Sequence, residues 1–228
     1  MSFEESTCIL KVLVGSRAHG LARPDSDYDY RSVYVVPTRE ILSLNSKHKS
    51  TQWIEAYKEK EEKDDSTGWE IGHFLSLATH CNPTILEVFA APIIHSTPEG
   101  EELRALFDSV WNPQGVRDAF IGYGLNQRKK FLENKGKNSS KFAVAYLRTL
   151  YQAYVLLCDK RLKVSFENTP TLLRLLQGYR DGDFSPGLIL DRCLFWQKEV
   201  EKAFETCKHE PNLTKVNQFL LKIRKDYW

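Results

Sequence analysis

Two aspartates with one residue between them, Asp27 and Asp29, are the side chains in this sequence whose type and spacing best suit chemistry. They follow turn-forming residues 23–26 and adjoin an apolar run that predicts a strand over residues 28–36. Side chains two apart on a strand face the same side, about 7 Å from each other, so the two carboxylates can share hard cations. Mg²⁺ prefers such oxygen ligands and takes its remaining ligands from water and substrate phosphates; Mn²⁺ accepts the same donors. The pair therefore predicts a site for two divalent ions that clamp an in-line phosphoryl displacement.

A Gly-Ser pair ends another predicted strand, residues 9–14. Gly15 has no side chain and lets the backbone approach a ligand closely. A short helix is predicted over residues 16–21, and the free N–H groups at its start favour a phosphate group, to which Ser16 adds a hydroxyl. Arg17 in the same segment, and Arg31 on the face of the two aspartates, are further candidates for binding phosphate oxygens.

Neither pair is informative alone, because Gly-Ser occurs in many turns and Asp-x-Asp in many loops. Residues 25–29 also resemble half of a calcium loop, but the glycine and the terminal glutamate that such a loop requires do not follow. The specific signal is the whole succession of strand, Gly-Ser, short helix, Ser-Asp-x-Asp and strand.

The rest of the chain predicts an α+β fold, in which a small mixed β-sheet core is followed by a C-terminal helical bundle. Further strands are expected near residues 51–56 and 66–71, a charged loop over 58–65, and short helices at 38–44, 71–77 and 84–89. Helical periodicity then dominates residues 98–107, 116–132, 141–157, 170–179, 188–207 and 214–223. We expect a catalytic core over residues 1–97 and a helical region over 98–228 that completes a cleft.

Composition sets limits on partners and location. The 228 residues carry 32 basic and 30 acidic side chains, so a global attraction to nucleic acid is not indicated. Residues 128–130 with Lys135, Lys137 and Lys141 are the best local candidate for a nucleic-acid contact, the alternative being a solvated helix end. No apolar run could span a bilayer, no secretory signal is visible, and the five cysteines are scattered. We expect reduced thiols, no membrane partner and a cytoplasmic location.

The succession from Gly15 to Asp29 resembles the signature of the DNA polymerase β-type nucleotidyltransferase superfamily. Within it, the chain resembles the predicted nucleotidyltransferases of an RNA-repair-associated family that also occurs in phages. Residues 65–75, 82–87, 141–148 and 179–182 are similar to further features of that family, so the resemblance covers nearly the whole chain. One departure is Ala145, which stands where the resemblance leads us to expect a histidine.

The resemblance implies magnesium-dependent transfer of a nucleoside monophosphate from an NTP to an acceptor hydroxyl, with an RNA 3′ end as one acceptor. Gly15 and Ser16 would hold the triphosphate, and Asp27 and Asp29 the metals. A third carboxylate is usual, as metal ligand or as base; Asp65 is the first choice and Glu70 the second. The set of expected nucleotide-binding residues is Gly15, Ser16, Arg17, Arg31 and Arg148.

Other interpretations remain open at this stage. The acceptor could instead be a small molecule or a protein side chain, or the chain could be an inactive nucleotide- or nucleic-acid-binding module, which has no need of paired carboxylates. Arg148 fits a structural salt bridge as well as a phosphate contact, and His19 fits a local hydrogen bond. Asn82 fits a helix cap, whereas Glu87 has no evident structural duty.

Overall fold

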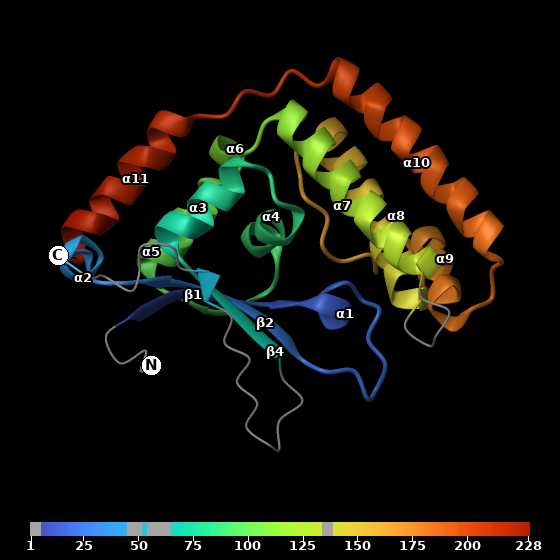
Figure 1. Cartoon of the computed structure of the whole chain (residues 1–228), viewed down its shortest axis with the longest axis horizontal. Coiled ribbons are helices and arrows are strands. Elements are labelled where there is room, and N and C mark those ends of the chain that lie inside the picture. The colour runs from blue at the N-terminus through green and yellow to red at the C-terminus, as the bar shows by residue number, and fades with distance from the viewer. Residues whose placement is uncertain (1–5, 45–51, 54–64, 134–138) are drawn as a thin grey trace.

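The computed structural model describes residues 6–44, 52–53, 65–133 and 139–228. The predicted strand at 51–56 is described only at β3 (Gln52–Trp53), and most of the predicted charged loop lies outside the described residues, as do Lys135 and Lys137. The α+β prediction is confirmed, because a mixed sheet is followed by a helical region (Figure 1). Among the described residues, no helix combines the length and apolar character needed to cross a bilayer.

The sheet has the strand order β3-β4-β2-β1-β5. Its other strands are β1 (Thr7–Val14), β2 (Asp29–Val35), β4 (Asp65–Glu70) and β5 (Ile93–Ser96). β1 is antiparallel to both β2 and β5, and β3 is antiparallel to β4, whereas β2 and β4 are parallel. The pairings Val14↔Asp29 and Asp29↔Asp65 bring the end of β1 and the starts of β2 and β4 to one edge. This edge carries the predicted succession of residues from Gly15 to Asp29, which we call the motif.

The short helices lie around the sheet, and the long ones form the bundle. The first group is α1 (Gly15–Ala18), α2 (Thr38–Leu42), α3 (Ile71–Thr79), α4 (Pro83–Ala90), α5 (Pro98–Arg104) and α6 (Phe107–Val110). The second is α7 (Pro113–Glu133), α8 (Ser139–Asp159), α9 (Pro170–Asp181) and α10 (Pro186–Thr206). The last helix, α11 (Leu213–Asp226), returns to the sheet side of the molecule (Figure 1).

Proline and a preceding polar residue set several helix starts. The helix predicted over residues 188–207 corresponds to α10, which begins two residues earlier, at Pro186. Ser185 caps this start, because its hydroxyl accepts from Leu188 N. Asn82 likewise caps α4, since its side chain accepts from Thr84 N at 3.0 Å. Proline at the first helical position loses no hydrogen bond, because that N–H has no partner within the helix. The break at residues 82–83 therefore separates α3 from α4.

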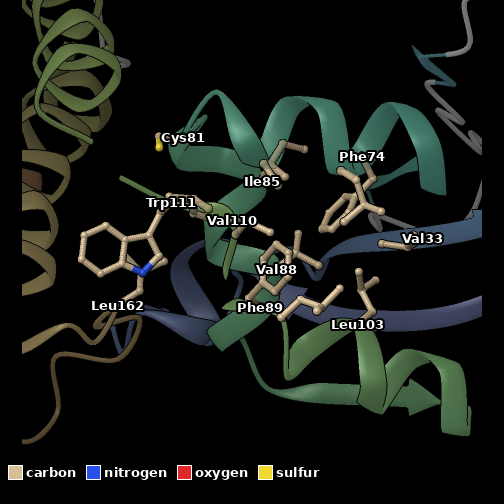
Figure 2. Close-up of a cluster of buried hydrophobic side chains, with 14 of the residues drawn as sticks. Val33, Phe74, Cys81, Ile85, Val88, Phe89, Leu103, Val110, Trp111 and Leu162 are labelled. Carbon is tan, nitrogen blue, oxygen red and sulfur yellow. The ribbon is translucent and has the colours of Figure 1, made fainter. Parts of the chain in front are cut away.

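One hydrophobic core spans the predicted boundary at residues 97/98. Phe74 of α3, Phe89 of α4 and Val33 of β2 belong to this core, and Leu103 and Trp111 from beyond the boundary join them (Figure 2). A second core fills the bundle and includes Tyr146, Leu150, Tyr179 and Cys193. Leu21, from the segment after α1, packs into this second core and so ties the motif to the bundle. The two-domain division stays a prediction.

Two glycines provide a test of the packing. Gly122 lies exposed in α7, where an added Cβ would meet nothing within 4 Å, so Gly122→Ala should stabilise the protein by about 1 kcal/mol. At Gly100 of α5, an added Cβ would lie 2.1 Å from Ile9 O, so Gly100→Ala should lower the free energy of unfolding by roughly 1–3 kcal/mol. Urea unfolding of both variants measures the two changes. Equal effects would contradict the close packing of α5 on β1.

Candidate active site

A cavity of about 640 Å³ lies between the motif and the bundle, within the size range of ligand pockets. The motif side and the bundle side both line it. The motif side provides Gly15, Ser16, His19, Leu21, Arg23, Asp25, Ser26, Asp27 and Asp29, and the bundle side provides Ser140, Lys141, Val144, Ala145, Arg148 and Arg180. Acidic side chains therefore face basic ones across a single space.

The contact between Gly15 and Asp29 shapes the motif side. Gly15 has a φ of +69°, which a side chain would strain, and its Cβ would lie 2.0 Å from Asp29 Oδ2. Val14 and Asp29 are partners in the sheet, which brings the Asp29 carboxylate against the glycine backbone. Only glycine fits this position. The strand begins at Asp29, so Asp27 lies exposed in the preceding loop rather than within the strand.

Arg17 holds the loop that carries Asp27. Its Nη2 donates to Ser26 O at 2.6 Å, and its guanidinium carbon lies 3.9 Å from the centre of the Tyr28 ring. Arg23 N also donates to Ser26 Oγ at 2.8 Å within the same loop. The prediction grouped Arg17 with the nucleotide-binding residues, but it does not line the cavity among the described residues. Its contacts are those of a brace for the loop.

The register distinguishes the two candidates for a third carboxylate. The Asp65 backbone is paired with Asp29, whereas Glu70 is paired with Tyr34, about 16 Å further along the strand. The Glu70 carboxylate is buried; it accepts from Gly72 N at 2.7 Å and forms an ion pair with Arg224 at 2.7 Å. The strand thus brings Asp65, not Glu70, to the edge that holds Asp29. The Asp65 side chain lies outside the description.

The donors at this edge fit a magnesium ion. Asp27 and Asp29 provide carboxylate oxygens, and the missing side chain of Gly15 leaves the space beside Asp29 Oδ2. Among the described side chains, no group of three histidine, cysteine, aspartate or glutamate residues could hold a metal. A bound Mg²⁺ would therefore need further oxygen ligands from water, from phosphates or from a residue outside that set.

A buried ion cluster lies behind the cavity, centred on Glu87, which is 4% exposed. His19 Nε2 lies 2.5 Å from Glu87 Oε1, and Arg31 Nη1 lies 2.7 Å from Oε2. Arg148 Nη1 lies 3.6 Å from Oε1 and donates to Gln152 Oε1 at 3.1 Å. These residues come from the end of α1, from β2, from α4 and from α8. The cluster therefore joins the sheet side to the bundle.

The cluster gives Arg31 and Arg148 different surroundings. Arg31 also donates to Thr84 O at 2.8 Å. The sequence predicted that Arg31 binds phosphate oxygens, but among the described residues it does not line the cavity. Arg148 does line the cavity. In the described part of the chain its polar contacts are all made by Nη1, so Nη2 and Nε remain for a ligand.

The charge states of the cluster follow from its geometry. Burial raises the pKa of the Glu87 carboxyl, but His19, Arg148 and Arg31 outweigh burial and hold this pKa well below its usual range. Burial, and next the charge of Arg148, lower the pKa of His19 below 6.5. His19 is therefore neutral, and its Nε2–H donates to Glu87. Sequence reasoning gave Glu87 no structural duty; its signals were a lone carboxylate in the run 84–89 and the similarity of residues 82–87 to a feature of the family.

Further basic side chains lie around the cavity. Arg23 forms an ion pair with Asp181, and Arg180 donates to Leu21 O. The predicted basic cluster at residues 128–130 occupies the end of α7, and Lys130 Nζ lies 5.8 Å from the centre of the Phe142 ring. Of the predicted basic residues that the structure describes, Lys141 lines the cavity, whereas residues 128–130 do not.

Comparisons with known proteins support the motif. The family model described as "RlaP: RNA repair pathway DNA polymerase beta family" matches residues 2–176. An uncharacterized 38.9 kDa protein of Enterobacteria phage T4 is 26% identical over 138 residues, 60% of this chain and 39% of its own length. The uncharacterized protein YcgL of Bacillus subtilis is 26% identical over 130 residues, 56% of this chain and 48% of its own. The matched regions thus span less than half of these relatives.

A nucleotidyltransferase-like protein from Exiguobacterium sibiricum is a similar solved structure, with 11% identity and a TM-score of 0.30 over 96% of this chain and 74% of that one.

The neutral His19 predicts a dependence of stability on pH. The unfolded chain takes up a proton at His19 near pH 6.5, and the folded protein does not. The free energy of unfolding should therefore fall as the pH drops below 6.5, by up to about 1.4 kcal/mol per pH unit. Glu87 keeps its charge in this window, because its pKa is held well below its usual range. Urea unfolding between about pH 7.5 and about pH 5.5 measures the slope.

His19→Gln removes the group that takes up this proton on unfolding, so the free energy of unfolding should depend less on pH, by up to the contribution of one proton. The glutamine keeps an N–H donor for Glu87. His95→Asn, a change at an exposed histidine, is the control and should leave the slope as it is. Equal slopes in wild type and His19→Gln would show that His19 does not stay neutral in the folded protein.

Proposed function

Since the chain belongs to the RNA repair pathway DNA polymerase beta family, we propose that it is a magnesium-dependent nucleotidyltransferase that moves a nucleoside monophosphate from an NTP to an acceptor hydroxyl. The observation that carries this proposal is the cavity in which Asp27 and Asp29, beside Gly15, face Lys141 and Arg148. Carboxylates suit the metal, and the basic side chains suit the triphosphate. Residues suited to the metal and residues suited to the triphosphate thus line the same cavity.

The carboxylates have two roles in this proposal. Asp27, Asp29 and Asp65 would hold Mg²⁺, or Mn²⁺ in its place, as a two-metal site. When bound, such ions neutralise the charge that develops on the transferred phosphoryl group and orient it for in-line displacement. Asp65 or an adjacent carboxylate would accept the proton of the acceptor hydroxyl. Glu70 has no part in this scheme, because its carboxylate is committed to Gly72 N and Arg224.

The phosphates have binding groups on two sides. The Gly15-Ser16 backbone and the Ser16 hydroxyl would hold the triphosphate from the motif side. The Nη2 and Nε groups of Arg148 would contact it from the bundle side. Arg17 and Arg31 support binding indirectly, through the loop that carries Asp27 and through Glu87.

An RNA 3′ end is the acceptor that the family and the surface charge favour. Lys141 offers exposed positive charge at the cavity, and residues 128–130 add exposed positive charge at the end of α7, which suits the backbone of an incoming strand. The overall charge of +2 limits this attraction to the local surface. Binding of the acceptor would therefore weaken as salt rises.

A transfer assay tests the proposal. Purified protein with Mg²⁺, each radiolabelled NTP in turn and pooled cellular RNA should place label on RNA. The double variant Asp27→Ala/Asp29→Ala should lose more than about a hundredfold of the rate, because the metal ligands are gone. Asp25→Ala, an exposed carboxylate of the same loop, is the matched control and should retain most of the activity. If folded wild type binds an NTP and leaves RNA unlabelled, the acceptor is a protein or a small molecule instead.

The third carboxylate has a separate test. Asp65→Asn should lower kcat more than about a hundredfold with little change in stability. Glu70→Gln should lower the free energy of unfolding by about 1–3 kcal/mol, because it leaves Arg224 without its partner, and should keep the activity per folded molecule. Transfer assays beside urea unfolding separate the two effects. The reverse result would assign the role to Glu70.

A further inference from the structure

Glu87 is a buried, ionised side chain that, among the described residues, does not line the cavity, so the proposed chemistry gives it no direct contact with the substrate. It lies on α4, whose residues 85–89 are all buried, so the helix is held on every side. The labelled Ile85, Val88 and Phe89 point into the hydrophobic core (Figure 2). Glu87 instead meets His19, Arg31 and Arg148. The apolar faces of α4 thus fix the helix, and its one carboxylate is left to fix other residues.

Both ends of α4 are also held by hydrogen bonds. Asn82 caps the start through Thr84 N at 3.0 Å. Arg104 Nη1 donates to Val88 O at 3.2 Å and to Ala91 O at 2.9 Å at the end. A helix that is packed and capped in this way gives the Glu87 carboxylate little freedom to move. It is suited to define the position of a partner that faces a ligand.

The charges of the cluster do not cancel. Glu87 carries one negative charge, Arg31 and Arg148 carry two positive charges, and His19 is neutral. One unit of positive charge is therefore left, and Arg148 is the cation of the cluster that lines the cavity. Its Nη1 donates to Gln152 Oε1 at 3.1 Å and lies 3.1 Å from His19 Nε2 and 3.6 Å from Glu87 Oε1, so Nη2 and Nε are the groups left for a ligand in that space. An anion in the cavity would complete the balance.

We propose that Glu87 is a positioning residue for the nucleotide: through its contact with Arg148 it holds the free edge of that guanidinium against the triphosphate. This inference rests on the proposed function and goes beyond it, since Glu87 itself touches no substrate. His19 assists by filling the side of Oε1 with a neutral donor, which keeps a third positive charge out of the cluster. The same contacts also hold the bundle in a fixed position relative to the sheet, and the cavity lies between the two.

The test uses a variant that keeps the charge balance. Glu87→Gln alone leaves two buried guanidinium groups uncompensated and endangers folding. Arg31→Gln/Glu87→Gln removes one charge of each sign, so the protein retains the same net charge while Arg148 loses its anchor. Isothermal titration with each of the four NTPs and Mg²⁺ gives the Kd. We expect binding about tenfold weaker than in wild type, equal to the loss in Arg148→Gln.

A double-mutant cycle shows whether the loss runs through Arg148. Adding Arg148→Gln to the Arg31→Gln/Glu87→Gln protein should weaken binding no further, because the anchored contact is already lost. A full additional loss would overturn the assignment, since Arg148 would then be placed without Glu87. In transfer assays the expected effect is mainly on KM, because Arg148 would contact the triphosphate before and during the reaction.

Arg224→Gln is the matched structural control. The Glu70–Arg224 ion pair is as buried as that of Glu87 and Arg31, with Arg224 19% and Arg31 20% exposed, but it lies away from the cavity. This variant should unfold at a lower urea concentration and keep the wild-type Kd for NTP. Wild-type binding in Arg31→Gln/Glu87→Gln, with weakened binding in Arg148→Gln, would overturn the role of Glu87 alone. Wild type that binds none of the NTPs would overturn this role and the proposed function together.

Discussion

A carboxylate withdrawn from water must be matched by cations or donors, and the rest of this structure is arranged around one such requirement at Glu87. An isolated buried charge would cost several kcal/mol, so the folded state depends on bringing Arg31, Arg148 and His19 to the same point. These residues are distributed along the chain from residue 19 to residue 148. The elements that carry them therefore cannot shift independently, and the cavity wall is fixed as a by-product of satisfying the charge.

The sheet imposes a second constraint on the same space. Antiparallel pairing puts Val14 opposite Asp29, and parallel pairing puts Asp29 opposite Asp65, so one edge collects groups that are far apart in sequence. A slip of one residue would turn the Asp29 side chain to the other face of the sheet and away from Gly15. The close approach of Gly15 and Asp29 thus depends on this register, and the register in turn places Asp29 and the backbone of Asp65 at one edge.

Sequence reasoning based its candidate site on residues whose signals are local. Gly15, Ser16, Asp27 and Asp29 lie within one strand–turn–strand segment, and their order alone pointed to the family that the comparison supports. The α+β class also followed from periodicity, because the long helices repeat apolar residues over several turns. The helix α6 was missed, since four residues are too few to show a period.

Contacts between distant segments were beyond the reach of the same reasoning. Asp65 and Glu70 lie on one strand, and only the pairing with β2 shows which of them reaches the edge. Arg17 and Arg31 have the chemistry of phosphate ligands, yet the fold directs them to Ser26 O and Glu87. No periodic pattern records such a choice, because it depends on which acceptor the folded chain places within 3 Å of a guanidinium.

The cavity also bears on which group can deprotonate an acceptor in the proposed reaction. His19 is the one histidine among the described lining residues, and its Nε2–H is committed to Glu87. The helix α8 offers no substitute, because Ala145 stands where the resemblance leads us to expect a histidine and its neighbour Val144 is apolar. A general base must lie within hydrogen-bond reach of the acceptor hydroxyl, so the proposed reaction leaves this role to a carboxylate near Asp29. In the proposed reaction, the acidic edge of the sheet would therefore carry the chemistry, and the bundle would contribute positive charge and shape.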